Sequence, residues 1–440
     1  MYSEARNAEF IERVKSCEKY KEDYKRLMEL ALEGGVVYDG KMVPFTYQPL
    51  LISEKDNDAF KYIVTRTNEI IRKVVAKYLE DEEFRKLFGF SKELEALILH
   101  DPGYEIPVPI GRYDVFYNNI VDFKFCEINT DGSSAMSEDS GLASIFKESE
   151  IFKDLELDGW NFRNYELYDS WVVKSLEIYE RAKGKKDKIN VAIVDFKDSG
   201  TPTDFEIFKN SYIDHGANCI IANIEELVYD ENKNKLILGD YEIDMVYRRA
   251  VTSEIIEKID MVEDFIKAYY NDAFISIGSF RSQIAHNKRF FKVLHHDTAD
   301  FLDGEDRLFI ENHVPYTDLF DGDEMKLSEI KNDRNRYIFK PNDLRGGHGV
   351  YVGSELSDDE FDEMAKKCYN NDYIFQEYVD KKLIDFVELK DDEWVDVKRA
   401  NMIGLFSYNE AFKGVYARFG VDNIIGSIRE YICAPAFRYE

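Results

Sequence analysis

The segment FKPNDLRGGHGVYVG (339–353) combines residue types that can hold phosphate groups. Gly346, Gly347 and Gly349 permit a backbone whose N–H groups converge on an anion. Lys340 lies on the strand that enters this loop and can place a positive charge on the same phosphates. The loop lacks the P-loop pattern, and its glycines precede a strand, whereas a dinucleotide fingerprint precedes a helix. A phosphate-binding loop and a glycine-rich hairpin turn therefore both fit the segment.

Acidic and amide side chains on two consecutive strand-like segments form a second candidate group. In FCEIN, Glu127 and Asn129 point to one face of a strand, with Cα atoms about 7 Å apart. In GRYDVFY, Arg112 and Asp114 share a face in the same way. A turn signal between the segments predicts a β-hairpin or meander over 105–130. A hairpin would bring Asp114, Glu127 and Asn129 together as a Mg²⁺ triad. A solvent-exposed polar row is the alternative.

Two weaker signals concern binding of the nucleotide base and of substrate. The apolar strand YIFQEYVD is interrupted by polar residues and leads into a linker, so its backbone can contact an adenine edge; the residues concerned are Gln376, Glu377, Tyr378 and Val379. Arg249 and Glu254 lie where a strand of an α/β unit ends, a common ligand position. They are candidates for substrate binding, as are Ser133 and Ser134, although an ordinary salt-bridge role fits Arg249 and Glu254 equally well.

Together these motifs resemble those of the ATP-grasp ligases. In that family a KP strand carries a phosphate lysine, a glycine-rich loop covers the phosphates, a QE-type hinge contacts adenine, and a Glu/Asn pair holds Mg²⁺. The resemblance implies that Lys340, the glycine loop and the hinge bind ATP. It also implies that Lys288, in the NK pair upstream of Lys340, is the first ATP lysine.

The order of the motifs is the informative feature. In ordinary ATP-grasp enzymes the Mg²⁺ residues follow the glycine loop, whereas here Glu127 and Asn129 precede it. This order is similar to that of the circularly permuted ATP-grasp proteins, best known from the glutathionylspermidine synthetases. Their pattern has R-x-D, E-x-N, the KP strand with its loop, and a late arginine, which Arg112 and Arg418 complete here. The resemblance covers about residues 105–440.

The resemblance implies a carboxylate–amine ligase that uses ATP and Mg²⁺. ATP phosphorylates a carboxylate and an amine attacks the acyl phosphate to form an amide, with Arg112 or Arg418 stabilising the developing charge. The chain departs from the family in lacking an amidase domain, in the segment TDGSSAMSED, and in carrying Arg345 and His348 in the loop. An ATP-dependent phosphotransferase and a catalytically silent scaffold are open alternatives, and the carboxylate donor and amine acceptor are undetermined.

We expect an α/β fold with α+β lobes: a circularly permuted ATP-grasp with a preATP-grasp-like parallel α/β domain. Residues 1–184 would form an N-terminal helical region plus the metal-binding β lobe. Residues 185–285 would form the parallel domain, in which 241–250 is predicted as one strand. Residues 286–440 would form the ATP-binding lobes with a glycine-rich lid.

Composition excludes several other classes. The charge of 58 − 87 = −29 argues against nucleic-acid and anionic-membrane partners. The five cysteines show no CxxC, so neither a disulfide framework nor a zinc site is indicated. The N-terminus is unlike a signal peptide, and no apolar run reaches about 18 residues. We therefore expect a cytoplasmic, soluble enzyme that acts on small molecules (an amino acid or peptide carboxylate and an amine), of undetermined oligomeric state.

Overall fold

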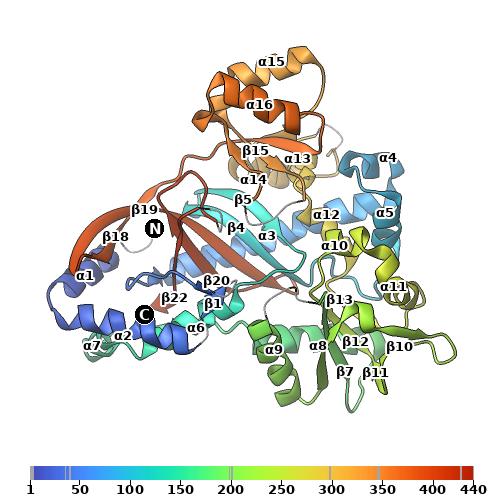
Figure 1. Ribbon diagram of the computed structural model, residues 1–440, viewed down its shortest axis with the longest axis horizontal. Coiled ribbons are helices and arrows are strands. Elements are labelled where there is room, and N and C mark those ends of the chain that lie inside the picture. Colours follow the sequence, from blue (N-terminus) through green and yellow to red (C-terminus); the bar gives the residue numbers. More distant parts are fainter. Residues whose placement is uncertain are drawn as a thin grey trace.

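The computed structural model describes residues 4–34, 36–38, 41–197, 199, 202–296, 299–343, 347–426 and 429–439. Its helices and strands form a mixed α/β fold in which three lobes surround a central sheet (Figure 1). Among the described residues no helix is long and apolar enough to cross a membrane.

The central sheet has the strand order β21-β20-β19-β4-β5, with β18 also paired to β19. Its strands are β4 (Ile110–Asn119), β5 (Asp122–Asn129), β18 (Leu383–Lys390), β19 (Glu393–Tyr408), β20 (Ala411–Gly420) and β21 (Ile432–Ala434). The hairpin predicted over 105–130 is present as β4 and β5. The sheet joins this hairpin to strands close to the C-terminus, because β4 pairs antiparallel with β19.

One face of the central sheet is covered by the long helix α3 (Glu54–Glu80). The helix begins where the Ser53 side chain accepts a hydrogen bond from the backbone N–H of Asp56. Tyr113 and Tyr117 of β4 reach toward it, with their hydroxyl groups bonded to Asn68 and Asp56. Because side chains alternate along a strand, Asp114 and Phe116 point to the opposite face.

The lower-right lobe contains a parallel sheet of order β13-β12-β7-β8. Its elements are β7 (Asn190–Asp195), β8 (Asn218–Asn223), β12 (Met245–Arg248), β13 (Ile275–Ile277), α8 (Asp169–Lys183), α9 (Pro202–Asp214), α10 (Thr252–Glu257) and α11 (Glu263–Tyr270). The strand–helix–strand unit predicted from the sequence is β7, α9 and β8, with the two strands parallel.

The prediction of a single strand over 241–250 is wrong. Residues Tyr241–Ile243 form β11, in a separate antiparallel sheet with β9 (Val228–Asp230) and β10 (Lys235–Leu238). Only β12 joins the parallel sheet. Asp244 separates them: its carboxylate accepts from the backbone N–H of Asn190, and its own N–H donates to the Asn190 carbonyl. The chain therefore changes sheets at this residue.

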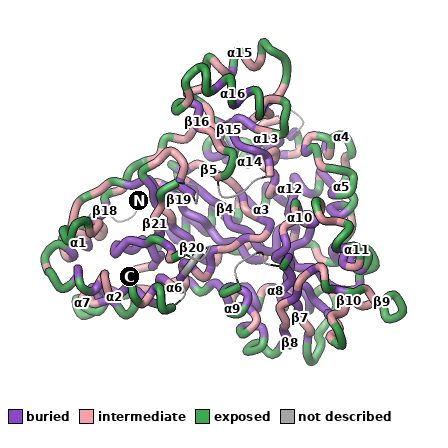
Figure 2. Tube along the Cα trace, in the orientation of Figure 1, coloured by how far each residue is buried: buried purple, intermediate pink, exposed green. Residues whose placement is uncertain are grey.

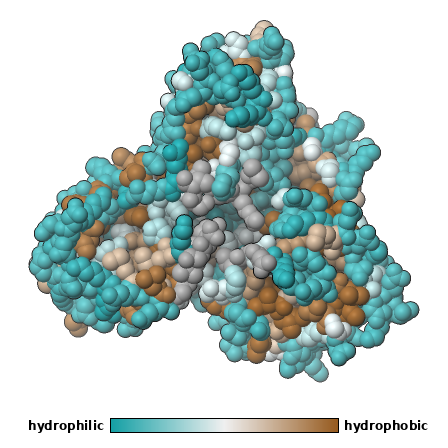
Figure 3. Space-filling view, viewed as in Figure 1, coloured by the Kyte–Doolittle hydropathy of each residue, from teal (hydrophilic) through white to brown (hydrophobic). Residues whose placement is uncertain are grey.

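The upper lobe is an antiparallel sheet of order β14-β17-β15-β16 with a core of its own around Phe320, Phe339 and Phe361. Its elements are β14 (Thr317–Leu319), β15 (Tyr337–Pro341), β16 (Tyr351–Val352), β17 (Tyr373–Glu377), α15 (Glu324–Asn332) and α16 (Asp358–Cys368). The surface over α15 and α16 is largely hydrophilic in Figure 3, as expected for helices whose apolar stripe faces this core.

The remaining elements complete the left-hand lobe and the connections. They are α1 (Glu4–Lys15), α2 (Lys19–Glu33), β1 (Val37–Tyr38), β2 (Lys41–Met42), β3 (Leu50–Ile52), α4 (Glu82–Arg85), α5 (Lys92–Leu99), α6 (Met136–Lys147), α7 (Glu150–Leu157), β6 (Phe162–Asn164), α12 (Gln283–His286), α13 (Arg289–Leu294), α14 (Gly304–His313) and β22 (Ala436–Tyr439). Burial is densest along the central and parallel sheets (Figure 2).

Candidate functional site

Four predicted site residues lie on the face of the β4–β5 hairpin that is opposite α3. Asp114 pairs directly with Glu127, and Arg112 with Asn129. The Asn129 side-chain amide donates to Glu127 Oε1 and to Asp114 Oδ2, at 3.2 Å each. The alternation of side chains thus places the two carboxylates and the amide next to one another.

Asp114 is fully buried and accepts hydrogen bonds from two arginines. Arg112 donates to both of its oxygens, at 2.7 and 3.1 Å, and Arg418 of β20 donates to Oδ2 at 2.6 Å. Burial alone would lower the pKa of Arg418, but the Asp114 carboxylate reverses this and raises it. Both guanidinium groups therefore stay charged at the floor of the site.

Glu127 is enclosed by two lysines that come from other parts of the chain. Lys288 precedes α13, and Lys340 lies on β15 of the upper lobe. Burial alone would raise the pKa of Glu127, but the charges of Lys288 and Lys340 bring it down to about 2. The pKa of Lys288 is lowered overall. Burial and the charge of Lys340 lower it, and the attraction of Glu127 offsets only part of this effect. Lys340 also donates to Gln376 Oε1 at 2.7 Å and to the Cys126 carbonyl at 3.3 Å.

A small cavity of about 10 Å³ lies between these groups. Glu127 and Ile128 of the central sheet form one side, and Lys340 and Gln376 of the upper lobe form another. Lys288 and His286 close it from the segment around α12. A carboxylate from the central sheet and lysines from the other two elements therefore share one cavity.

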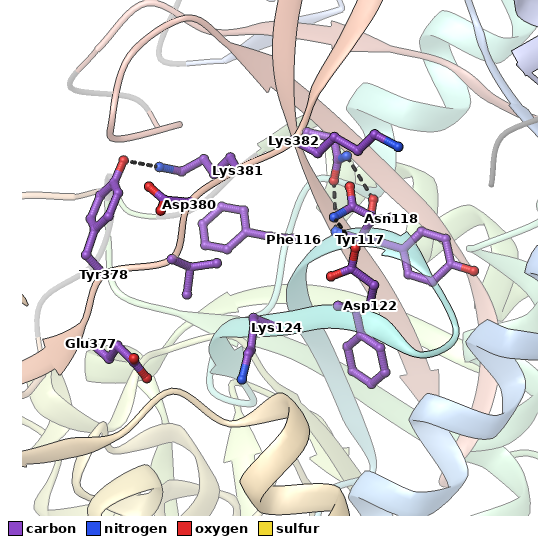
Figure 4. Close-up of a pocket in the computed structure, with 13 residues that line it drawn as sticks. Phe116, Tyr117, Asn118, Asp122, Lys124, Glu377, Tyr378, Asp380, Lys381 and Lys382 are labelled. Atoms are coloured by element: carbon purple, nitrogen blue, oxygen red, sulfur yellow. Dashed lines mark hydrogen bonds between the residues drawn. The ribbon is translucent and has the colours of Figure 1, made fainter. Parts of the chain in front are cut away.

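A larger pocket, of about 230 Å³, lies at the hinge between the upper lobe and the central sheet (Figure 4). Glu377, Tyr378 and Val379 line it together with Phe116 of β4. The Lys381 ammonium lies 5.2 Å from the Phe116 ring centre and 4.7 Å from that of Tyr378, and donates to the Tyr378 hydroxyl at 3.0 Å. Burial lowers the pKa of Lys381 to about 8.

Part of the hinge backbone is already engaged. The N–H groups of Glu377 and Tyr378 donate to the carbonyls of Tyr316 and Arg336, at 2.8 Å each. These two N–H groups are therefore not available to a ligand. Any contact of the hinge with a base edge must use its carbonyls or the backbone of Val379.

The glycine loop is described only in part. Arg345 and Gly346 lie outside the described residues. Gly347 and Gly349 have φ values of 81° and 70°, in the left-handed region that favours glycine, and the Val350 N–H donates to the Gly347 carbonyl at 3.3 Å. The described part of the loop is thus a tight turn between β15 and β16.

Two of the four predicted substrate residues, Ser133 and Ser134, contact arginines through their backbone carbonyls. The Ser134 carbonyl accepts from Arg112 at 2.9 Å, and the Ser133 carbonyl accepts from buried Arg249. These contacts place the loop after β5 against both Arg112 and the parallel sheet. Glu254, in contrast, forms an i,i+4 ion pair with Lys258 at 2.7 Å.

The donor set at the hairpin fits a hard divalent cation. Glu127 offers carboxylate oxygens, and the Asn129 side-chain carbonyl points from the same strand face. Asp114 would be the third ligand, although its oxygens accept from Arg112, Arg418 and Asn129. Among the described residues no group of three or more His, Cys, Asp or Glu side chains forms a metal site. A cation here would therefore combine two carboxylates with an amide oxygen.

Some residues at the site belong to no motif recognised in the sequence. Phe116 and Lys381 line the hinge pocket. Gly404 and Tyr416, on β19 and β20, lie beside the two arginines. A glycine inside a strand is a sign of close side-chain or backbone approach, and this signal could have identified Gly404.

No family model matches the sequence, and no curated protein sequence matches it. The fold is similar to that of a glutathione synthetase-like effector from Globodera pallida in its apo form. That structure has a TM-score of 0.59 and 12% identity, and the match covers 95% of this chain and 96% of the other. A protein described as a gamma-glutamylcysteine synthetase from Methylobacillus flagellatus KT matches with a TM-score of 0.39 and 8% identity, covering 83% and 87% of the two chains.

Proposed function

We propose that this protein is an ATP- and Mg²⁺-dependent carboxylate–amine ligase of circularly permuted ATP-grasp architecture. The observation that carries the proposal is the enclosure of Glu127 by Lys288 and Lys340 from two other elements, in one cavity. Two lysines beside a carboxylate that can bind a metal ion are suited to binding a polyphosphate that carries Mg²⁺. The fold similarity to a glutathione synthetase-like effector supports the same class.

The charges of the site agree with this ligand. Arg112, Arg418, Lys288 and Lys340 are four cationic groups, and Asp114 and Glu127 are two anionic ones. The excess of two positive charges complements the two negative charges of ATP that carries one Mg²⁺. Because these groups are buried or partly buried, their charges are screened little by solvent.

Each part of the chain then has a task. The hinge pocket, with Phe116 and Val379, would hold the adenine, and Lys288 and Lys340 would hold the phosphates. Glu127, Asn129 and Asp114 would hold Mg²⁺, which when bound neutralises charge on the transferring phosphoryl group. Arg112 and Arg418 would stabilise the charge that develops when a carboxylate becomes an acyl phosphate and an amine attacks it. The glycine loop would exclude water from that intermediate.

We also infer the three-part organisation proposed from the sequence, 1–184, 185–285 and 286–440. The central sheet combines β4 and β5 from the first range with β18 to β21 from the last range. A circularly permuted chain would build one lobe from N-terminal and C-terminal segments in this way. A peptide or amino acid is the proposed carboxylate substrate, and a glutathionylspermidine-type product is one candidate among several.

The decisive experiment is a screen for ADP release over amino acids, short peptides and polyamines, with mass detection of products. Amide formation with phosphate release supports the ligase, whereas a stable phosphorylated product indicates a phosphotransferase. Glu127→Gln should abolish turnover and weaken Mg²⁺-ATP binding measured by calorimetry. Absence of Mg²⁺-ATP binding in the unmodified protein would favour a catalytically silent scaffold.

A further inference from the structure

Gly404 and Tyr416 lie directly beside the two arginines of the site. They pair with each other across β19 and β20, and Gly404 also pairs with Asp114 on β4. Asp114, Gly404 and Tyr416 therefore form one row across three strands, on the face of the sheet opposite α3. Gly404 is the position in this row that has no side chain.

The missing side chain at Gly404 makes room for Arg112. A Cβ atom at Gly404 would lie 2.6 Å from Cδ and 2.9 Å from Cγ of Arg112, and 2.9 Å from Oδ1 of Asp114. The backbone at Gly404 is outside the left-handed region, so alanine could adopt its conformation. The need for glycine is therefore one of space: the alkyl chain of Arg112 passes over this residue.

Tyr416 supplies an aromatic surface for both guanidinium groups. Its ring centre lies 5.4 Å from Cζ of Arg112 and 5.3 Å from Cζ of Arg418, within the range of cation–π contacts. The ring is buried, and its hydroxyl donates to the Glu138 carboxylate and lies 3.3 Å from Cys433 Sγ. The ring is therefore fixed at its far end while its faces contact the arginines.

We propose that Gly404 and Tyr416 are positioning residues that hold Arg112 and Arg418 side by side on Asp114. The two guanidinium groups repel each other, and the carboxylate and the electron-rich ring offset this repulsion from two sides. The inference rests on the proposed function, because accurate placement of two charges matters most where charge develops in a transition state.

A double-mutant cycle tests the role of Gly404. In the full chain, Gly404→Ala should lower kcat for ADP release roughly tenfold to a hundredfold, with the KM for ATP changed by less than about twofold. Added to Arg112→Ala, the same change should cause a smaller further loss of kcat and a smaller loss of stability in urea unfolding, since only the contact with Asp114 Oδ1 remains. Gly420→Ala, in β20, adds a methyl group that meets only Ile425 and Glu430 within 3.4 Å, and should leave kcat near that of the unmodified protein.

Substitutions at Tyr416 test the aromatic surface. Tyr416→Phe keeps the ring and should retain most of kcat, whereas Tyr416→Leu should lose it roughly tenfold or more. Equal losses in both variants, or equal losses from Gly404→Ala with and without Arg112, would overturn the inference while leaving the ligase intact. If the unmodified protein neither binds Mg²⁺-ATP nor releases ADP, the proposed function fails, and the catalytic positioning role fails with it.

Discussion

Arg418 Nη2 lies 2.6 Å from Asp114 Oδ2, although 304 positions separate the two residues in the chain. Asp114 also binds Arg112, two positions away on the same strand. One buried carboxylate thus ties the β4–β5 hairpin to a strand near the C-terminus. Its position explains how the two ends of the chain can build one site.

Asp114→Asn should destabilise the protein by about 3 kcal/mol, because removal of one partner from a buried ion pair leaves the other charges uncompensated. It should also abolish ADP release, since both arginines lose their anchor. Urea unfolding and the turnover assay measure the two effects. The control is Glu9→Gln, which breaks the exposed pair with Arg6 and should change stability by less than about 1 kcal/mol. Equal stability of the two variants would show that Asp114 does not hold the arginines.

Local sequence patterns predict part of this site and not the rest. The spacing of Arg112 and Asp114, and of Glu127 and Asn129, places each pair on one strand face, and the turn between them predicts the hairpin that the structure contains. The alternation rule needs no knowledge of tertiary structure. Arg418 joins the same sheet through pairing between strands that are far apart in the sequence, and hydrophobic periodicity does not specify such pairing. Only the resemblance to the ATP-grasp family pointed to this residue.

The contribution of Tyr416 could not be predicted for the same reason, and a glycine inside a strand signals a close approach at Gly404 without showing which residue approaches. Gly404 matters because β4 happens to be its neighbour, and a single sequence does not show which strands pair. The strand predicted over 241–250 was wrong because its apolar pattern continues across Asp244, while the backbone hydrogen bonds of that residue divide it between two sheets. Hydrophobic pattern indicates a strand but not the sheet to which each half belongs.

Lys340→Met should weaken Mg²⁺-ATP binding at least tenfold. It should also lower the stability of the ligand-free protein, because buried Gln376 loses its hydrogen-bond donor and Glu127 loses one of the charges that compensate it. Lys340 lies close enough to Lys288 that its charge lowers the pKa of that lysine. Its removal therefore relieves one repulsion, which offsets part of the stability loss, while it deletes the proposed phosphate contact. Calorimetric titration and thermal unfolding separate the two effects. Lys367→Met, on the exposed side of α16, is the control and should change neither. Loss of stability together with unchanged ATP affinity would mean that Lys340 is structural.

Phe116→Ala should weaken ATP binding by about 1–3 kcal/mol, the usual range for loss of an aromatic surface under a base. Phe116 lines the hinge pocket beside Tyr378 and Lys381. Binding of inorganic triphosphate should be unaffected, because the lysines proposed to hold the phosphates line the other cavity. Val121→Ala, at the exposed tip of the same hairpin, serves as the control. An equal loss for ATP and triphosphate would show that Phe116 does not contact the base.

Asp139→Asn should stabilise the protein, by an amount that grows with pH. Burial raises the pKa of Asp139 from 3.8 to about 8, and Oδ2 has no hydrogen-bond partner among the described residues. Between these two pKa values the folded state keeps a proton that the unfolded state has released. The stability of the unmodified protein therefore falls as pH rises through this window, by up to about 1.4 kcal/mol per pH unit.

The asparagine variant lacks this proton linkage, so the difference in unfolding free energy between it and the unmodified protein should increase from pH 5 to pH 8 and level off above that. Urea unfolding at several pH values measures the slope. Asp240→Asn, at an exposed turn between β10 and β11, should give a pH-independent difference close to zero. A flat difference for Asp139→Asn as well would mean that Asp139 is ionised in the folded protein. An ionised Asp139 would need a second hydrogen-bond donor or a positive charge, in addition to the Ala436 N–H that donates to its Oδ1 at 3.3 Å.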